Sequence, residues 1–313
     1  MKPLRIGTRA SALARWQAES VRAQLAAVGC AAELVLIRTS GDRDLDTPLR
    51  LIGGKGVFTK EIESALLENR VDLAVHSMKD LPTALPDGLL IAAICRRDDV
   101  RDALVSRAGL ALHDLPQGAR LGTSSLRRQA QLRHRRPDLA MADVRGNVDT
   151  RLAKVARGEY DAVVLAKAGL ERLGMSDRIT EILSPEVCLP AAGQGAIGIE
   201  SRAPVNDADR EIFFALALLN HAPSRLAVAT ERAVLAGLSG GCDLPLGVWA
   251  RDVAGELVMD ACVLSLDGTE AVRVRRAGAP RDAEAIGRDV TAALLHGGAD
   301  RLLALGGRSR GRS

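Results

Sequence analysis

The segment GTSSLRR (residues 122–128) places hydroxyl side chains directly before two arginines. Thr123 and Ser125 lie where an expected strand becomes an expected helix. Free backbone N–H groups and hydroxyls at such a point can hold a carboxylate or a phosphate. Arg127 and Arg128 add planar charged donors within the same helical turn. The pattern favours an anion-binding site, and the alternative is a capped helix with solvated arginines.

The sequence contains five cysteines, of which Cys242 differs from the rest in its surroundings. It lies in the glycine-rich, proline-bounded loop LSGGCDLPLG (238–247), which can turn sharply and expose a thiol. Cys30, Cys188 and Cys262 lie near apolar stretches, as small core residues do. An odd number of widely spaced cysteines does not indicate a disulfide framework. The alternative for Cys242 is a partly buried, inert thiol.

A third candidate is VHSMKDLPT (75–83), in which Lys79 and Asp80 follow an apolar run. A carboxylate at the end of a buried strand can stabilise a developing cation or move a proton. The alternative is an ordinary surface ion pair.

Other motifs carry less information. AAGQGAIG (191–198) spells GxGxxG, but Pro190 precedes it and an apolar strand follows, which is the wrong context for dinucleotide binding. QLRHRRP (131–137) lacks the interleaved aromatic residues of a nucleic-acid site, so we interpret it as a solvated helix face. The scattered histidines and the lack of a CxxC pair give no support for a metal site.

The elements that would position these residues alternate between strand and helix, which predicts α/β lobes with mainly parallel sheets. Expected strands are 4–8, 32–39, 71–77, 120–123, 139–144, 160–170 (running into a turn) and 196–201, and expected helices are 11–28, a helix ending near Asn69, 124–136 and 145–158. The strand 196–201 could return to the first lobe, giving two crossovers. From about Asn220 we expect a third unit: a helix, the Cys242 loop, strands within 247–265 and a helix over 282–296.

Composition limits the function classes. The net charge is +4 with a pI near 9.0, and arginine greatly outnumbers lysine. Arginine suits bidentate recognition of carboxylates, although GC-rich coding also explains the bias. No apolar run approaches the length of a membrane span, and the N-terminus lacks an apolar signal segment. We therefore expect a cytoplasmic protein that binds neither nucleic acid nor membrane.

Together and in this order, the segments resemble the porphobilinogen deaminase (hydroxymethylbilane synthase) family over about 240 residues. The matching stretches are GTRASALARWQ, GGKGVFTKEIE, DLAVHSMKDLPT, GTSSLRRQAQL, RGNVDTRL, LAKAGLERLG, LPAAGQGAIGIE and GGCDLPLG. The resemblance implies a transferase that condenses four porphobilinogen molecules head to tail, releasing ammonia at each step, and then hydrolyses the product to hydroxymethylbilane. It also implies a dipyrromethane cofactor in thioether linkage to Cys242.

By the same resemblance, Asp80 is the catalytic residue, which stabilises cationic pyrrole intermediates and assists proton transfers. The residues implied to hold the cofactor with Cys242 are Ser77, Lys79, Asp80, Thr123, Ser125, Arg127, Arg128 and Arg145. Those implied to bind or line the substrate site are Arg9, Ser11, Lys55, Phe58, Arg145, Arg151, Arg172, Gln194 and Gly195. One departure is Leu51, with Arg50 beside it, where the family often has a lysine.

The resemblance further implies three α/β domains, the first two like the lobes of a type II periplasmic binding protein and the third a small α+β domain with the cofactor loop. We place the first domain at 1–95 plus 197–216, the second at 96–196 and the third at 219–313. We expect a monomer with a small-molecule substrate. The alternative function is a non-catalytic, two-lobed anion-binding protein, against which the GGC loop argues.

Overall fold

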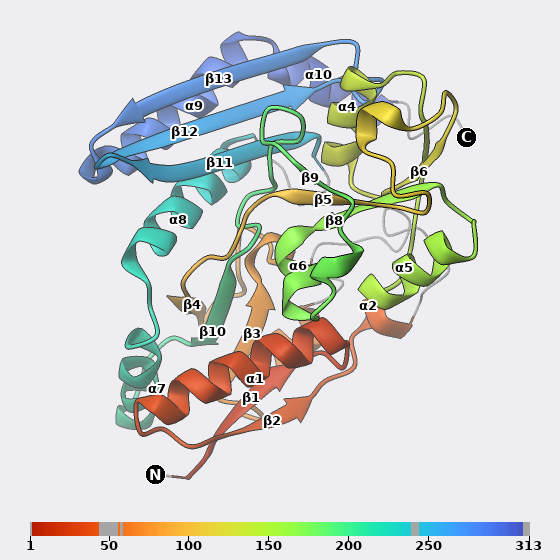
Figure 1. The fold of residues 1–313 in the computed structure, drawn as a ribbon. Helices are drawn as coiled ribbons and strands as arrows, with labels where there is room; N and C mark the ends of the chain where they lie inside the picture. The colour runs from red at the N-terminus through yellow and green to blue at the C-terminus, as the bar shows by residue number, and fades with distance from the viewer. Residues whose placement is uncertain (1, 44–55, 57–58, 239–243, 309–313) are drawn as a thin grey trace. The chain divides into compact units, whose positions relative to one another are not determined.

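The computed structural model describes residues 2–43, 56, 59–238 and 244–308 (Figure 1). The chain divides into two compact units. Unit 1 comprises Met1–Asp98 and Gly195–Arg225, and unit 2 comprises Asp99–Gln194 and Leu226–Ser313. The chain therefore crosses between units three times, after Asp98, after Gln194 and after Arg225. The three-domain boundaries expected from the sequence stay a prediction.

Unit 1 is built on a five-stranded sheet of order β2-β1-β3-β10-β4. Its strands are β1 (Leu4–Thr8), β2 (Ala32–Leu36), β3 (Leu73–Ser77), β4 (Leu89–Ile94) and β10 (Ile197–Arg202). β1 runs parallel to β2 and β3, whereas β10 is antiparallel to both of its neighbours. The expected return of the strand near 196–201 to the first lobe is confirmed.

Helices cover both faces of this sheet. They are α1 (Ala12–Ala27), α2 (Ser40–Arg43), α3 (Lys60–Leu67) and α7 (Asp207–Ala217). α1 packs against β1, β2 and β3, as Figure 1 shows, and α7 packs against β4 and β10. Val75 lies in the core under α1, whereas Ala74 lies in the core under α3. Because side chains alternate along a strand, His76 of β3 points to the same side as Ala74, toward α3.

Unit 2 begins with a second five-stranded sheet, of order β7-β6-β8-β5-β9. Its strands are β5 (Asp102–Ser106), β6 (Arg120–Gly122), β7 (Ala140–Ala142), β8 (Ala162–Ala166) and β9 (Glu181–Leu183). The helices are α4 (Leu126–Arg135), α5 (Val148–Ala156) and α6 (Lys167–Arg172). Parallel strands β7, β6 and β8 are followed by the antiparallel strand β5. The strand order matches that of unit 1. In each sheet the fourth strand is antiparallel to the third and belongs to a segment that follows a crossing between the units.

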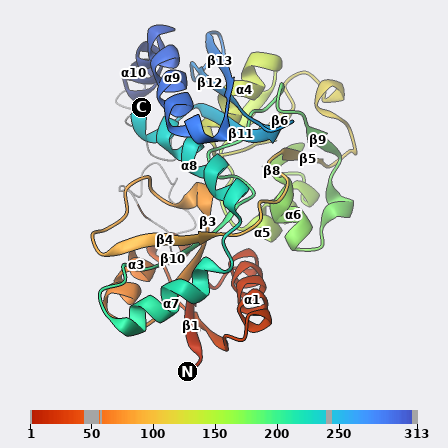
Figure 2. The same cartoon turned by 90° about the vertical axis from the view of Figure 1, so that its left-hand side faces the viewer.

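The remainder of unit 2 is a three-stranded antiparallel sheet with helices on one face. It contains α8 (Ala222–Gly237, which begins in unit 1), β11 (Leu246–Val253), β12 (Glu256–Leu264), β13 (Ala271–Gly278), α9 (Ala283–His296) and α10 (Ala299–Arg308). Figure 2 shows α9 and α10 together on one side of the sheet and α4 on the other. The opposite face carries Cys262, which packs against Ala130 and Leu189.

The expected α/β architecture is confirmed, with differences of detail. Both large sheets are mixed, because each crossover adds an antiparallel strand. The segment expected to be a turn after β8 is the helix α6. Strands β4, β5, β9 and β13 and helices α7 and α10 were not predicted. Among the described residues no single helix is long and apolar enough to cross a membrane; α7 and α8 pass that test only as a pair, bent by 103°.

The close approach of Gly247 to Leu189 allows a stability test of the contact between β11 and the segment Leu189–Pro190. A Cβ on Gly247 would lie 2.8 Å from Leu189 Cβ and 2.9 Å from the Leu189 carbonyl oxygen, and Val248 N donates to Pro190 O over 2.8 Å. Gly247→Ala should therefore destabilise the protein by about 1–3 kcal/mol, as overpacking does. Chemical denaturation measures this.

Gly287→Ala in α9 is the matched control, because a Cβ there meets Thr230 Cγ2 at an ordinary 3.4 Å. The added helix propensity should leave this variant unchanged or stabilise it by up to about 1 kcal/mol. Equal effects of the two substitutions would contradict the packing argument.

Candidate functional site

In unit 1 the carboxyl ends of β1 and β3 bring predicted site residues together. The two strands are parallel neighbours, so the residues that follow them meet at one edge of the sheet. A pocket at this edge is lined by Arg9, Ser11, Ser77 and Asp80 from the predicted set. Other lining residues are Leu13, Ala14, Gln17, Thr59, Val75 and His76. Lys79 does not line this pocket, although it lies one residue before Asp80.

Local hydrogen bonds fix the walls of this pocket. Ser11 caps α1, its Oγ accepting from Ala14 N at 3.3 Å. Gln17 Nε2 donates to Ser77 Oγ over 2.8 Å. After Ser77 the chain enters a 3₁₀ turn, Met78–Asp80, which leaves Asp80 exposed. The carboxylate that the sequence indicated for catalysis is thus presented to solvent from a rigid strand end.

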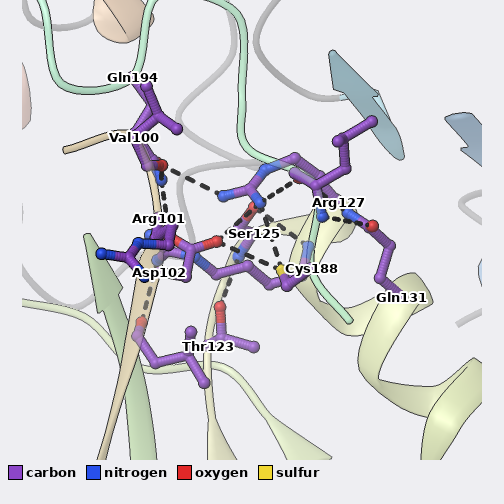
Figure 3. Close-up of polar contacts among 12 residues, drawn as sticks. Val100, Arg101, Asp102, Thr123, Ser125, Arg127, Gln131, Cys188 and Gln194 are labelled. Atoms are coloured by element: carbon purple, nitrogen blue, oxygen red, sulfur yellow. Dashed lines mark hydrogen bonds and ion pairs between the residues drawn. The ribbon is translucent and has the colours of Figure 1, made fainter. Parts of the chain in front are cut away.

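In unit 2 the predicted residues Arg127 and Arg128 converge on a carboxylate that was not predicted, Asp102. Arg127 Nη1 lies 2.7 Å from Asp102 Oδ2, and Arg128 Nη2 lies 2.7 Å from Asp102 Oδ1. Gln194 Nε2 donates to Oδ1 over 2.8 Å, and Cys188 Sγ lies 3.3 Å from Oδ2 (Figure 3). Asp102 is completely buried and both arginines are at least 95% buried. The two arginines are not the solvated forks of the alternative interpretation.

This cluster determines the charge of its members. Burial alone would raise the pKa of Asp102, but the charges of Arg127 and Arg128 and their hydrogen bonds hold it far below its usual range. Burial would lower the pKa of Arg127, and Asp102 more than reverses that effect. Burial, together with the charge of Asp102, raises the pKa of the Cys188 thiol to about 12. Asp102 is therefore ionised and Cys188 is a neutral thiol.

The hydroxyl groups of the GTSSLRR segment organise the start of α4. Ser125 is its N-cap, and its Oγ accepts from Arg128 N at 3.5 Å. Thr123 Oγ1 accepts from Ser125 N at 3.3 Å, and Ser124 Oγ bonds both O and N of Val144. The capped-helix interpretation is correct as a description of local structure, and a ligand role of these residues stays a prediction.

Three more predicted arginines lie around α5 and α6. Arg145 precedes α5, and Arg151 within that helix donates from Nε to Gly146 O over 2.8 Å. Gly146 has φ of +105°, which favours glycine. Arg172 is the last residue of α6 and is buried. The structure leaves their predicted contacts with a ligand untested.

The charge balance of unit 2 fits a group that bears several carboxylates. Two guanidinium groups share the single carboxylate of Asp102, which leaves one buried positive charge. Arg127 Nε and Arg128 Nε are buried and form no hydrogen bond within the protein. Dipyrromethane carries carboxylate side chains, so the donor chemistry suits it.

Cys242, Lys55 and Phe58, with the departure at Arg50 and Leu51, lie outside the described residues.

The sequence analysis did not identify Asp102, nor the buried titratable residues Glu63, His76 and Glu200 of unit 1. Asp102 opens an otherwise apolar strand, DALVS, and an acid in such a run is the one signal that could have identified it. The expectation of Cys188 and Cys262 as core residues is confirmed, whereas Cys30 is only half-buried. Cys95 is buried as well.

Removing the charge of Asp102 should destabilise unit 2 strongly. Asp102→Asn leaves two buried guanidinium groups without a counter-charge, which typically costs about 3–5 kcal/mol. Because the folded pKa of Asp102 is depressed, its contribution is present above about pH 4, the unfolded pKa, and is lost as the pH falls further. Chemical denaturation at several pH values should show the gap to wild type narrowing in acid.

Asp138→Asn is the control, because Asp138 also pairs with an arginine, Arg136, at 2.7 Å but near the surface. It should change the denaturation midpoint little. A similarly small effect of Asp102→Asn would show that the buried cluster is not required.

The buried thiols should be inert in the folded protein. The pKa of Cys188 is about 12 and burial also raises that of Cys262, so both lack thiolate near neutral pH. Alkylation at pH 8 followed by peptide mass analysis should label half-buried Cys30 before Cys188 and Cys262, and all three thiols after denaturation. Labelling of native Cys188 as fast as Cys30 would contradict this assignment.

Comparison with known proteins identifies relatives of the whole chain. The family model described as the porphobilinogen deaminase dipyrromethane cofactor-binding domain matches residues 4–210, and that of the porphobilinogen deaminase C-terminal domain matches residues 225–296. A curated porphobilinogen deaminase from Syntrophobacter fumaroxidans is 51% identical over 302 residues, covering 96% of each chain.

Solved structures give more distant likenesses. A periplasmic sulfonate-binding protein, SsuA, from Methylobacillus flagellatus is 15% identical, covering 74% of this chain and 68% of its own, with a TM-score of 0.40. The methionine-binding protein MetQ is 12% identical, covering 74% and 93%, with a TM-score of 0.44. The two family models together span most of the sequence, and the curated deaminase is 51% identical over nearly its whole length. The chain belongs to the porphobilinogen deaminase family.

Proposed function

We propose that this chain condenses four porphobilinogen molecules head to tail with release of ammonia, and hydrolyses the product to hydroxymethylbilane. The observation that carries the proposal is the 51% identity to a porphobilinogen deaminase over 96% of both chains. The family makes the chain a transferase of tetrapyrrole biosynthesis. Its cofactor is dipyrromethane, for which the matching family model is described as the binding domain.

Cys242 is the residue that we propose to hold the cofactor, through a thioether. When bound, dipyrromethane supplies the free pyrrole α-carbon to which the first substrate molecule is joined. Unit 2 is suited to hold its carboxylates, because its buried arginines exceed their counter-charge. We assign this task to Thr123, Ser125, Arg127, Arg128 and Arg145.

Asp80 is the residue that we propose to act at the reacting carbon. When ammonia leaves porphobilinogen, the remaining pyrrole carries positive charge, and a fixed carboxylate nearby lowers the energy of that state. Asp80 is exposed at a strand end, in a pocket with Arg9, Ser11 and Ser77. Arg9 and Ser11 can bind the carboxylates of the substrate while Asp80 faces the cation.

The growing product adds carboxylates with each substrate molecule, and arginine side chains are the natural partners for them. We assign Arg9 and Ser11 of unit 1, and Arg145, Arg151 and Arg172 of unit 2, to substrate carboxylates. Lys55, Phe58 and Gln194 are assigned to the lining of the substrate site, and Ser77 and Lys79 to contacts with the cofactor. A monomeric, cytoplasmic enzyme that binds neither nucleic acid nor membrane completes the proposal. The non-catalytic anion-binding alternative is not favoured, because the whole-length relative is a deaminase.

Removal of the Asp80 charge should abolish most turnover. Asp80→Asn keeps the shape and removes the fixed negative charge, and loss of such an electrostatic group costs about 10²–10³ in kcat. Because Asp80 is exposed, the variant should unfold at the same denaturant concentration as wild type.

The exposed Asp87, seven residues further along the chain, provides a matched control. Asp87→Asn should retain full turnover of porphobilinogen. Asp80→Asn with wild-type kcat would exclude the assigned role.

Intact mass tests the cofactor assignment independently. Wild-type protein should be heavier than its sequence by two condensed pyrrole units, and Cys242→Ser should lack this excess. Equal masses for the two proteins, even after incubation with porphobilinogen, would contradict attachment at Cys242.

A further inference from the structure

Behind the Asp80 pocket, three titratable side chains that the proposed reaction does not use are buried together in unit 1. Glu63 of α3, His76 of β3 and Glu200 of β10 are exposed by 7%, 6% and 0%. His76 Nε2 lies 3.0 Å from Glu200 Oε2. Glu200 pairs in register with Ala74, so by alternation it points, like His76, to the α3 face.

The polar atoms of this cluster lack the hydrogen bonds that buried groups normally have. His76 Nε2, both carboxylate oxygens of Glu200 and Glu63 Oε1 form none, so the 3.0 Å approach is close but not aligned. Each such atom costs about 1–3 kcal/mol when nothing satisfies it. No group of His, Cys, Asp and Glu in the described part of the chain is arranged to hold a metal ion. Protons are therefore the occupants that fit.

Charge balance shows why protons must be shared. One imidazolium can neutralise one carboxylate, and the cluster has two carboxylates in a buried site. Burial raises the pKa of Glu63, and the charge of Glu200 adds to the rise. The Thr59 hydroxyl, His76 and Lys60 act in the opposite direction without cancelling it. Burial and the charge of Glu200 thus favour the protonated form of Glu63.

The surrounding elements offer little other compensation. β4 (LLIAAI) carries no charged residue. Arg5 of β1 is engaged with Asp72, and Arg202 of β10 contacts Asp72 and Asp209. Lys60 of α3 is the only cation besides His76 among the influences on Glu63 named above. On the pocket side, the charged groups are Arg9 and Asp80.

His76 connects this cluster to the pocket. Together with Asp80 and Ser77 it lines the pocket wall, whereas Glu63 and Glu200 do not. A proton in the pocket can therefore reach the buried carboxylates through His76.

The proposed reaction releases a proton at each addition. The C–N bond of the incoming porphobilinogen breaks and ammonia leaves with the electron pair. A C–C bond then forms at the free α-carbon of the chain end, whose C–H electrons return to the ring as the proton departs. The proton finally combines with ammonia or solvent, so no oxidant or reductant is needed. It must leave the pocket before the next addition.

We propose that Glu63, His76 and Glu200 form a buried proton-sharing cluster that accepts, through His76, the proton released in the Asp80 pocket at each addition. His76 is in this scheme a relay and positioning residue, acting with Asp80. The inference rests on the proposed function and adds to it a route for the proton. Acid conditions, which load Glu63 with a proton in advance, should slow the relay.

The test compares His76→Gln and Glu63→Gln with wild type as full-length holoenzymes. The substrates are porphobilinogen and porphobilinogen deuterated at its free α-carbon. His76→Gln keeps hydrogen-bonding capacity but cannot titrate. Its turnover should fall at least about tenfold, the low end for general acid–base groups. The deuterium isotope effect should rise and the acid limb of the pH–rate profile should flatten.

Glu63→Gln separates relay from structure, because the amide resembles a protonated Glu63. A raised folded pKa means that wild type loses stability as the pH rises from about 4.3, the unfolded pKa, through the raised value. The variant lacks that loss, so its denaturation midpoint should exceed that of wild type increasingly with pH. Its turnover should nevertheless fall several-fold with a larger isotope effect. Gain of stability with loss of turnover is not the signature of a merely structural residue.

Glu68→Gln, at the exposed end of α3, is the matched control and should change neither isotope effect nor turnover. If His76→Gln and Glu63→Gln turn over porphobilinogen with the pH profile and isotope effect of wild type, the proposed relay is overturned and the proposed function is not. A wild-type protein that does not turn over porphobilinogen would instead overturn the proposed function. If His76→Gln does not fold, Glu63→Gln still decides: parallel stability curves or unchanged turnover would overturn the proposal.

Discussion

The carboxylate of Asp102 is the contact on which the organisation of the second α/β sheet depends. It stands at the first position of β5, completely buried, and receives donors from Arg127, Arg128, Gln194 and Cys188. Through Arg128, which also donates to Val164 O, the network reaches β8. One side chain thereby fixes the start of α4, two strands and the end of the segment that leaves unit 2. A buried carboxylate is tolerable here because both of its oxygens are paired with charged donors.

The same contact explains why unit 2 is suited to anions. A single carboxylate cannot compensate two guanidinium groups, so the excess charge favours ligands with carboxylates of their own. The pocket of unit 1 instead carries one charge of each sign, and Asp80 supplies the negative one beside Arg9. A reaction that generates a cation while accumulating carboxylates needs both properties. The two sheets share one strand plan, and in the proposed function residues near their strand ends divide these two electrostatic tasks.

The sequence predicts those parts of the fold that local pattern determines. β1, β3, α1 and α4 follow from apolar runs and from Ser11 and Ser125 as caps, and the structure has them. The short or antiparallel strands β4, β5, β9 and β13 were missed, because their pairing partners lie far along the chain and their own patterns are weak. Of the pocket residues, Asp80 was indicated by its place after an apolar run, whereas Arg9, Ser11 and Ser77 came from the family resemblance; the parallel pairing of β1 and β3 explains why they meet.

Buried clusters are the part that sequence cannot supply. Glu200 is 124 residues from His76, and the only hint of their contact is an acid within the apolar strand IGIESR. Asp102 and Arg127 are 25 residues apart in different elements. In each case an acidic residue in a buried strand indicates that a partner exists, but the topology of the fold decides which residue it is. The hint is physical, because an unpaired charge there would prevent folding.

The two clusters differ in a way that bears on what each one does. Both oxygens of Asp102 have well-aligned donors, which hold the strand and the helix that supply them in one arrangement, although Arg127 Nε and Arg128 Nε are buried without a hydrogen bond. The cluster of Glu63, His76 and Glu200 is equally buried but leaves its polar atoms without aligned partners. Stability alone would favour its replacement by apolar side chains of similar size. A protein that keeps such a cluster beside Asp80, the carboxylate proposed for catalysis, bears a cost in stability, and the proposed transfer of a proton at each addition accounts for this cost.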